Sequence, residues 1–407
     1  MNILFLQGLA TPFLKSLAGL LADKGHTIHK LSFCGGDMLF WLGGKRPAAR
    51  WHHHLYRGRA DALPDYYARF IDAHRIDAVV LFGDTRPVHE PVIHLCRRRG
   101  IPVHVLEEGY VRPNWITMDM NGANAASALP RDPAYYRTNY GDAALQARID
   151  RATPVGGGFK RRVAMDFALH VANLLGWPLF PRYRTHRPHI VGVEYAGFVR
   201  RFVRNLARGG RYKAIYRRLA EGDADFYLLP LQLDGDSQIR RHCDFADASE
   251  VLETVIASFA AHAPDDSLLA IKLHPLDNGL TDYDGLSRSI AARLGVAGRV
   301  LFFEGGALPH LLRKARGVVT VNSTVGLSAL IHILKVKTLG RALYDLEGLT
   351  YRGPLDDFWR ARHEPDSELL DAFRAGLIAQ SQINGNFFTR KGIIIGTNKA
   401  VPRILKL

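Results

Sequence analysis

The chain has 407 residues, of which 47% are hydrophobic and 23% are charged, so neither a disordered chain nor a fibrous protein is indicated. This length favours two or three domains, and we expect two. The 54 Lys and Arg residues outnumber the 39 Asp and Glu residues, and the net charge of +15 predicts an anionic partner such as nucleic acid, lipid headgroups or a phosphorylated substrate.

Cysteine usage and hydropathy narrow the class further. The 3 cysteines are scattered without metal-type spacing, which argues against a disulfide framework or a structural metal and fits a reducing cytoplasm. The apolar residues 1–6 are interrupted at once by Gln7 and Gly8, so we expect a first strand there and not a signal peptide. No apolar run reaches the roughly 18 residues that cross a bilayer, so membrane contact is expected to be peripheral.

Apolar runs of strand length alternate with helical patterns in two series along the chain. They predict strands at 3–6, 27–33, 78–82 and 103–106, and then at 226–229, 268–273, 300–303, 318–321 and 336–339. Strands that alternate with helices form parallel sheets. We therefore predict an α/β fold of two facing doubly wound, Rossmann-like domains with a cleft between them, the architecture called GT-B.

The two series also set the expected domain boundaries. The predicted order is an N-terminal domain over 1–195, a linker helix over 196–222, a C-terminal domain over 223–352, and a segment over 353–407 whose helices pack back toward the N-terminal domain. The glycines and prolines between 156 and 188 predict no continuous core element in that stretch. The residues from Asn384 onward are expected to form a weakly structured or edge-packed tail.

The predicted linker is a basic amphipathic helix. Between 198 and 218, apolar residues share one helical face and arginines supply most of the rest. Such a helix is typical of a membrane surface, but a linker with solvated arginines fits the same pattern equally well. The sequence is therefore consistent with a membrane-binding helix and with an interdomain linker.

Three short polar motifs stand where predicted strands end. They are Glu107-Glu108-Gly109, His274-Pro275 and Asn322-Ser323-Thr324. In an open α/β sheet, ligands bind in the crevice outside the carboxyl ends of the strands, so motifs far apart in sequence can converge on one pocket. The motifs therefore predict an enzyme site.

Each motif also has a plainer interpretation. Glu107 and Glu108 can supply a base or nucleophile, because adjacent carboxylates raise each other's pKa, but a solvated acidic turn is the commoner origin of such a pair. His274, aimed by the proline after it, can donate to a phosphate leaving group or be satisfied by a carbonyl. Ser323 or Thr324 either caps a helix or holds a phosphate at its N-terminus.

Three further motifs are weaker. Asp37, which follows two glycines, can shape an acceptor pocket with Phe40-Trp41, or belong to a loop that these aromatic residues anchor. The Asp-x-Asp that ends at Asp236 lacks a second acidic cluster for a metal, so we expect sugar or acceptor contacts, or a turn. Consecutive histidines on a helix point in different directions, so His52-His53-His54 is expected at the surface and no metal site is predicted.

Together, these and neighbouring segments resemble bacterial capsule polysaccharide biosynthesis proteins of the KpsS and KpsC type, which are β-Kdo glycosyltransferases. The resemblance covers nearly the whole chain. The segment 110–115 and the presence of a single catalytic unit are more similar to KpsS than to KpsC. The matching segments are 33–37 with 40–41, 83–87, 107–117, 236–239, 272–277, 319–330, 348–350 and 355–359.

This resemblance implies a GT-B glycosyltransferase that uses CMP-Kdo as donor, without a metal or other cofactor. It would transfer Kdo, with retention of configuration, to a (lyso)phosphatidylglycerol acceptor and so start the poly-Kdo linker of a capsular polysaccharide. The implied location is cytoplasmic, peripherally at the inner membrane. The implied partners are the membrane surface, a KpsC-type transferase and the capsule export complex, but no nucleic acid. The N-terminal domain would bind the acceptor and the C-terminal domain the CMP-sugar.

The resemblance also implies roles for particular residues, since bacterial sialyltransferases, which use another CMP-activated keto sugar, carry a similar trio of motifs. The implied CMP-binding residues are Lys272, His274, Pro275, Asn322, Ser323 and Thr324. The implied catalytic residues are Glu107, Glu108 and His274, and the implied acceptor or sugar contacts are Asp37, Arg112, Asp236 and Gln238. Family members often carry Asp at the position of Glu108, so which glutamate is the nucleophile stays open. The alternatives are another nucleotide-sugar or CDP-alcohol transferase and a nonenzymatic capsule assembly or export factor.

Overall fold

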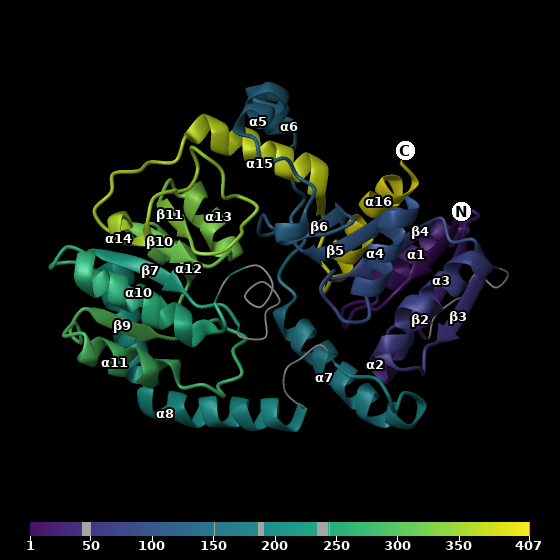
Figure 1. Ribbon diagram of the computed structural model, residues 1–407, viewed down its shortest axis with the longest axis horizontal. Coiled ribbons are helices and arrows are strands. Elements are labelled where there is room, and N and C mark those ends of the chain that lie inside the picture. Colours follow the sequence, from purple (N-terminus) through teal and green to yellow (C-terminus); the bar gives the residue numbers. More distant parts are fainter. Residues whose placement is uncertain (43–49, 150, 186–190, 234–242, 244, 407) are drawn as a thin grey trace. The chain divides into compact units, whose positions relative to one another are not determined.

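The computed structural model divides the chain into two compact units (Figure 1). It describes residues 1–42, 50–149, 151–185, 191–233, 243 and 245–406. Unit 1 comprises Met1–Leu129, Ala147–His186 and Ala375–Leu407, and unit 2 comprises Pro130–Gln146 and Arg187–Arg374.

Unit 1 is built on a seven-stranded sheet with the order β12-β6-β5-β4-β1-β2-β3. The five strands from β5 to β3 are parallel, and β6 runs antiparallel to both of its neighbours. The chain order reverses between β1 and β4, which makes their carboxyl ends the switch point of the sheet. The strands are β1 Asn2–Phe5, β2 Thr27–Ser32, β3 Trp51–Leu55, β4 Ala78–Phe82, β5 Val103–Glu108, β6 Trp115–Met120 and β12 Gln382–Asn384.

Helices cover both faces of this sheet. Because successive strand residues point to opposite faces, Ile3 and Phe5 of β1 pack in the core beneath α1 and α16, whereas Leu4 packs in the core beneath α3 and α4. Strand β1 contributes apolar side chains to the cores on both faces of the sheet. Its sequence is therefore an unbroken apolar run. The helices of unit 1 are α1 Phe13–Asp23, α2 Gly35–Leu39, α3 Leu63–His74, α4 Glu90–Arg99, α7 Phe159–Leu175 and α16 Arg390–Leu405.

Unit 2 has a five-stranded sheet in which all strands are parallel, with the order β11-β10-β7-β8-β9. This is the order of the parallel strands of unit 1, and its switch point lies between β7 and β10. The strands are β7 Phe226–Pro230, β8 Leu268–Lys272, β9 Val300–Phe303, β10 Gly317–Thr320 and β11 Lys335–Thr338.

The remaining helices belong to unit 2 or join the units along the chain. In the part of the chain that the structure describes, no helix has the combined length and apolar character of a bilayer-spanning segment. Helices α6 and α15 each contain a unit boundary. These helices are α5 Pro133–Tyr140, α6 Ala143–Ile149, α8 Val191–Glu221, α10 Ala248–His262, α11 Tyr283–Arg293, α12 Leu308–Leu312, α13 Thr324–Ile331, α14 Leu355–Phe358 and α15 Ser367–Ser381.

The predicted α/β class with two Rossmann-like sheets is confirmed. Residues 51–55 differ from expectation, because they form strand β3 and not a helix. The stretch from 156 to 188 was expected to lack a continuous core element, and the 17-residue helix α7 that it contains has no fully buried residue. The residues from Asn384 onward are edge-packed and not weakly structured, because β12 pairs with β6 at the edge of the sheet and is followed by α16, a 16-residue helix with one buried face.

Candidate active site

The switch point of unit 1 brings Glu107 close to a part-buried arginine. Gly83 follows β4, and a Cβ atom placed on it would lie 3.3 Å from Oε1 of Glu107 and 3.5 Å from Nε of Arg86. Nη1 of Arg86 donates to the carbonyl of Gly8, which follows β1, at 3.0 Å. Burial lowers the pKa of Arg86, while Tyr183 and Glu107 oppose that shift. Glu107 therefore stands where an α/β sheet binds its ligand, beside a fixed positive charge.

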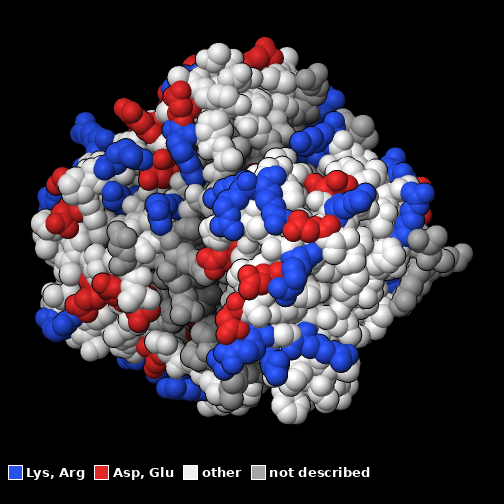
Figure 2. All heavy atoms as spheres, turned by 45° about the vertical axis from the view of Figure 1, so that its right-hand side comes forward, with Lys and Arg blue, Asp and Glu red and all other residues white. Residues whose placement is uncertain are grey.

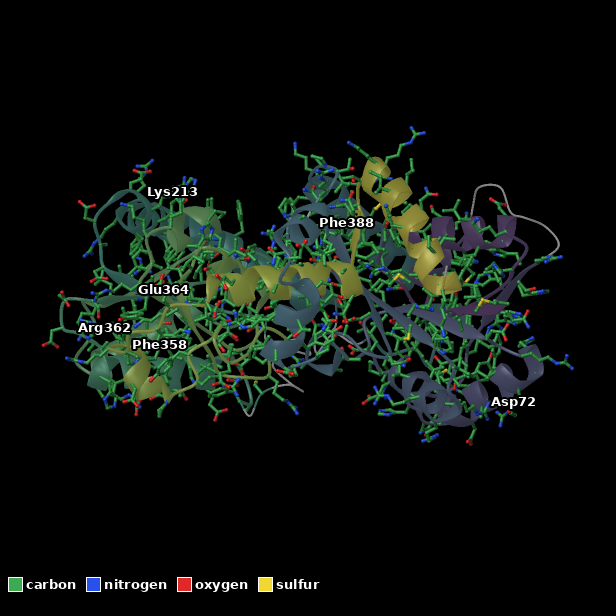
Figure 3. The ribbon with its side chains drawn as sticks, turned by 90° about the horizontal axis from the view of Figure 1, so that it is seen from above. Asp72, Lys213, Phe358, Arg362, Glu364 and Phe388 are labelled. Atoms are coloured by element: carbon green, nitrogen blue, oxygen red, sulfur yellow. The ribbon has the colours of Figure 1, made fainter. Side chains whose placement is uncertain are left out.

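Glu108, by contrast, is held by two arginines. Its Oε2 accepts from Nη2 of Arg112 at 3.1 Å, and its Oε1 accepts from Nη1 of Arg162 on α7 at 2.5 Å. The Arg162 guanidinium also stacks on Phe388, which is labelled in Figure 3, at 5.2 Å from the ring centroid. Gly109 makes the turn after β5 feasible, because a Cβ there would lie 2.1 Å from the carbonyl oxygen of Trp115.

Asp37 lies at the carboxyl end of β2, where it forms a buried ion pair. Lys30 Nζ donates to its two carboxylate oxygens at 2.8 and 2.9 Å and to the carbonyl of Leu6 at 2.9 Å. Lys30 and Asp37 are only 1% and 8% exposed. Asp37 thus fixes the start of α2 against β2, and any contact with an acceptor has to compete with Lys30.

A reciprocal pair of hydrogen bonds spans the switch point of unit 2. Gln232, just after β7, donates from Nε2 to Oδ1 of Asn322 at 2.9 Å and accepts from the Asn322 backbone N–H at 3.1 Å. Gln232 is buried, so this pair fixes the backbone that follows β10. Sequence reasoning did not identify Gln232, since its partner is 90 residues away.

Ser323 forms the N-cap of α13, as one of its two interpretations predicted. Its Oγ accepts from the backbone N–H of Val325 at 3.2 Å, and its carbonyl accepts from the buried Tyr344 hydroxyl at 2.5 Å. Ser323 and Thr324 are both part-exposed, so their side chains remain accessible at the helix N-terminus. The backbone N–H groups of this first turn favour negative charge.

A backbone hydrogen bond determines which ring nitrogen of His274, just after β8, carries the proton. The backbone N–H of Leu276 donates to Nδ1 of His274 at 3.1 Å, so a neutral imidazole carries its proton on Nε2. Lys272, at the end of β8, is buried, and burial lowers its pKa with help from Arg201, while Glu304 opposes the shift. Strand β8 therefore ends with the Lys272 ammonium and with the oriented Nε2–H donor of His274.

A polar hollow lies at the carboxyl end of β11, where the sequence suggested no site. The loop after β11 is tied to β10, since Leu339 N–H donates to Thr320 O and Gly340 N–H donates to Val321 O, both at 2.9 Å. The basic residues around the end of β11 are the sequence feature that could have indicated this hollow. The hollow is lined by Cys243, Lys337, Thr338, Leu339, Gly340, Arg341, Asp345, Tyr351 and Arg352.

The predicted site residues thus gather at the carboxyl edges of the two sheets, each within its own unit. Glu107, Glu108, Arg112 and Asp37 belong to unit 1, and Lys272, His274, Pro275, Asn322, Ser323 and Thr324 belong to unit 2. Asp236 and Gln238 lie outside the described residues.

Two doubly wound units, each with polar side chains at its switch point, define an α/β protein built to bind ligands at the carboxyl ends of its strands. The model of the family described as capsule polysaccharide biosynthesis protein matches residues 77–388. The chain belongs to this family.

Curated relatives agree over nearly the full length. The capsule polysaccharide modification protein LipB of Neisseria meningitidis is 37% identical over 391 residues, which cover 96% of this chain and 92% of the relative. The capsule polysaccharide export protein KpsS of Escherichia coli is 35% identical over 396 residues, which cover 95% and 96%.

Among solved structures, the β-Kdo 2,7 transferase of Thermosulfurimonas dismutans KpsC aligns over 88% of this chain and 93% of its own, at 14% identity and a TM-score of 0.42. A TM-score at this level does not establish a shared fold, so the fold assignment rests on the strand order of the chain itself.

Proposed function

We propose that this protein is a retaining β-Kdo glycosyltransferase that moves Kdo from CMP-Kdo to a (lyso)phosphatidylglycerol acceptor and so starts the poly-Kdo linker of a capsular polysaccharide. Membership of the capsule polysaccharide biosynthesis family supports a role in the synthesis of a capsular polysaccharide. The observation that carries the proposal is the set of hydrogen-bond donors at the carboxyl edge of unit 2, where His274 and the N-terminus of α13 stand beside the switch point.

We propose that unit 2 binds the CMP phosphate without a metal. Nε2–H of neutral His274 donates to a phosphate oxygen, the hydroxyls of Ser323 and Thr324 supply further donors, and the N-terminal end of the α13 dipole favours the negative charge. CMP leaves as a phosphate monoester, which such donors can stabilise as its charge develops. The basic hollow beyond β11 offers room for the rest of the nucleotide.

We propose Glu107 as the nucleophile and Glu108 as a positioning residue. Glu108 is engaged by two arginines, which lowers the nucleophilicity of its carboxylate. In the first step, the bond from the anomeric carbon of Kdo to the phosphate oxygen breaks, its electron pair leaves with CMP, and a Glu107 oxygen bonds to that carbon. The acceptor hydroxyl then displaces the carboxylate and loses its proton to solvent. Two inversions give net retention.

The arrangement of α8 supports a membrane-bound acceptor. Its arginine face packs inward on unit 2: Arg201 pairs with Glu304 at 2.8 Å, and Arg208 pairs with Asp282 at 2.8 Å and with Asp284 at 3.0 Å. These arginines are therefore paired and not simply solvated. The apolar face points outward, and its residues Phe198, Val199, Phe202, Val203 and Leu206 are 41–72% exposed.

Helix α7 repeats this feature in unit 1. Phe159, Val163, Phe167, Val171 and Leu174 follow helical spacing along one side of the helix and are 40–77% exposed. Lys160 and Arg161 stand at its start. Lys and Arg side chains are spread in several groups over the face in Figure 2, interspersed with Asp and Glu, so charge alone marks no single docking patch there. We propose that the exposed apolar faces of α7 and α8 insert into the headgroup region of an anionic membrane.

The membrane step is tested by flotation with vesicles of phosphatidylglycerol and phosphatidylcholine. Phe202→Asp and Phe167→Asp are expected to reduce vesicle binding about tenfold or more, because each puts a charge into the apolar face. Ile394→Asp is the matched control, since Ile394 is 53% exposed on α16. Equal binding by all three variants would contradict insertion through α7 and α8.

The donor step is tested by measuring nucleotide release from CMP-Kdo, CMP-sialic acid, UDP-sugars and CDP-alcohols. We expect release from CMP-Kdo alone, and a loss of about 100-fold in kcat/KM in His274→Ala, as for removal of a transition-state donor. His332→Ala, at the exposed far end of α13, is the control. Release from another donor would favour a different transferase.

The names of the relatives favour one second candidate, a nonenzymatic export or assembly factor. In that case a capsule-deficient strain carrying His274→Ala would still produce capsule. Under the transferase proposal, this strain makes none, while the His332→Ala strain does.

A further inference from the structure

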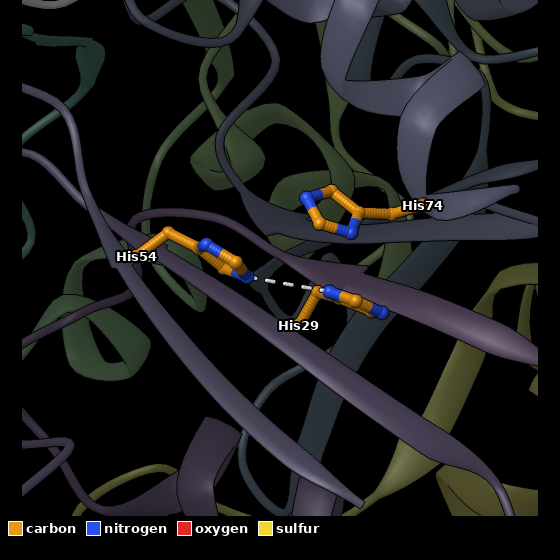
Figure 4. A group of neighbouring side chains, drawn as sticks. All are labelled: His29, His54 and His74. Carbon is orange, nitrogen blue, oxygen red and sulfur yellow. Dashed lines mark hydrogen bonds between the residues drawn. The ribbon is translucent and has the colours of Figure 1, made fainter.

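Three histidines from separate segments meet on the α3-covered face of the unit 1 sheet (Figure 4). His29 lies on β2, His54 on the edge strand β3, and His74 is the last residue of α3. One ring nitrogen from each lies within 4.8 Å of the other two, and Nδ1 of His29 is 3.3 Å from Nε2 of His54. Nothing in the proposed transfer reaction uses these residues.

Strand geometry explains why the sequence interpretation missed this group. Because β3 is a strand, His52 and His54 point to one side and His53 to the other, where its Nε2 lies 2.9 Å from the Ser32 hydroxyl. His54 is the residue of the His52-His53-His54 run whose ring nitrogen meets those of His29 and His74, while His52 stacks on the His29 ring with centroids 4.9 Å apart. The two partners of His54 come from 25 residues before it and 20 residues after it in the chain.

We propose that His29, His54 and His74 bind a divalent transition metal ion, with Zn²⁺ as the best match. Imidazole nitrogens bind Zn²⁺ at about 2.0–2.1 Å, so two of them in a tetrahedral site lie about 3.4 Å apart. The separation of 3.3 Å between Nδ1 of His29 and Nε2 of His54 is close to this value. The longer separations close by rotation of His74, which is only part-buried at the end of its helix.

The surroundings suit a metal site that is partly closed. His29 is only 5% exposed, so its imidazole is shielded from solvent. Phe70 stands edge-on to His54, with ring centroids 4.9 Å apart, and shields one side. Three protein ligands leave a fourth position for water or another small donor.

The ion would join three segments of unit 1 that lie far apart in the chain. It would tie the edge strand β3 and the end of α3 to β2, and so stabilise the sheet edge. The cluster lies on a sheet face and not at the carboxyl edge that holds Glu107 and Asp37, and we therefore assign it a structural role. Asp72, which lies on α3 two residues before His74, is labelled at the lower edge of the view in Figure 3.

The proposal is tested with the full chain, freed of metal by a chelator and titrated calorimetrically with Zn²⁺. We expect one tight site per chain and a rise in Tm on binding. His54→Ala and His74→Ala should each weaken this site about 100-fold or more, because loss even of a residue that only orients a metal ligand costs about 10–100-fold. With Co²⁺ in place of Zn²⁺, the wild type should show the strong visible absorption of a tetrahedral nitrogen site.

His53→Ala is the matched control, since it removes a histidine from the same strand but from its opposite face, and it should bind Zn²⁺ like the wild type. Circular dichroism establishes that each variant is folded before titration. The proposal is overturned if the wild type has no saturable tight site, or if folded His54→Ala and His74→Ala bind Zn²⁺ as tightly as His53→Ala does.

Discussion

At the residue scale, Glu107 and Glu108 are neighbours in the chain with different surroundings. Glu108 shares its charge with Arg112 and Arg162, whereas Glu107 reaches toward Gly83 and Arg86 at the switch point. The sequence identified the pair but could not rank its members. The ranking depends on Arg162 and Arg86, which are brought to the pair by α7 and by the loop after β4.

This difference predicts unequal effects of removing each charge. Glu107→Gln should abolish transfer, a loss of about 1000-fold or more in kcat, while CMP still binds with its normal affinity. Glu108→Gln should lose less, about 10-fold to 100-fold, and should weaken acceptor binding because Arg112 and Arg162 lose their partner. Steady-state kinetics with calorimetric CMP binding would measure both, and a greater loss in Glu108→Gln would reverse the assignment.

The buried pair Lys30–Asp37 predicts a strong asymmetry between single and double substitutions. Asp37→Ala should lower the free energy of unfolding by about 3–5 kcal/mol, because it leaves a buried ammonium without its counter-charge. The double variant Lys30→Met/Asp37→Leu should recover most of this loss. Urea denaturation checks both, and a single variant as stable as the wild type would show that Asp37 is not the partner Lys30 needs.

Asp119 predicts a pH dependence of stability. Burial raises its pKa to about 6 from 3.8, and it accepts a hydrogen bond from Tyr110 at 3.3 Å. Between about pH 4 and pH 6 the folded state therefore holds a proton that the unfolded state has lost. Raising the pH through this window lowers the free energy of unfolding, by up to roughly 3 kcal/mol.

Asp119→Asn should remove this contribution. Urea denaturation of wild type and variant at pH 4.5 and pH 7 isolates it, because all other titrating groups are common to both proteins. The wild type should lose more stability than the variant on going to pH 7, and parallel losses would show that Asp119 titrates normally.

At the element scale, the parallel strands could be predicted and the edge elements could not. A strand with both faces buried is a continuous apolar run, as Ala78–Phe82 shows, and its position was predicted without error. Strand β3 carries Trp51 and three histidines, so it is not a continuous apolar run. Strands β6 and β12 form the antiparallel edge of the sheet and are not continuous apolar runs either. Helix α16 contains two glycines and Pro402, which disfavour a helix in isolation.

Close packing explains why α16 contains glycines. It also predicts whether an alanine substitution stabilises or destabilises the protein. A Cβ on Gly396 would lie 2.9 Å from the Phe13 ring and 3.3 Å from Ile116, so Gly396→Ala should destabilise unit 1 by about 1–3 kcal/mol. Gly209→Ala on α8 meets no atom within 4 Å and should stabilise by about 0.5–1 kcal/mol. Thermal unfolding compares them, and the same sign for both would contradict the packing of α16 on α1.

At the scale of the whole molecule, the chain uses one strand order twice. Both sheets reverse between their first and fourth parallel strands, and in each the reversal is bridged by a side chain: Arg86 reaches Gly8 in unit 1, and Gln232 pairs with Asn322 in unit 2. The sequence predicted which strand ends carry polar residues. It could not predict these bridges, because they join residues about 80 to 90 positions apart.

The most direct test of the central claim is the mass of the product. Purified protein is incubated with CMP-Kdo and lyso-phosphatidylglycerol, and the lipid is analysed by mass spectrometry. We expect a lipid heavier by one Kdo residue, formed by the wild type and by His332→Ala but not by Glu107→Gln or His274→Ala. A lipid of unchanged mass, with CMP-Kdo intact and the wild-type protein folded, would contradict it.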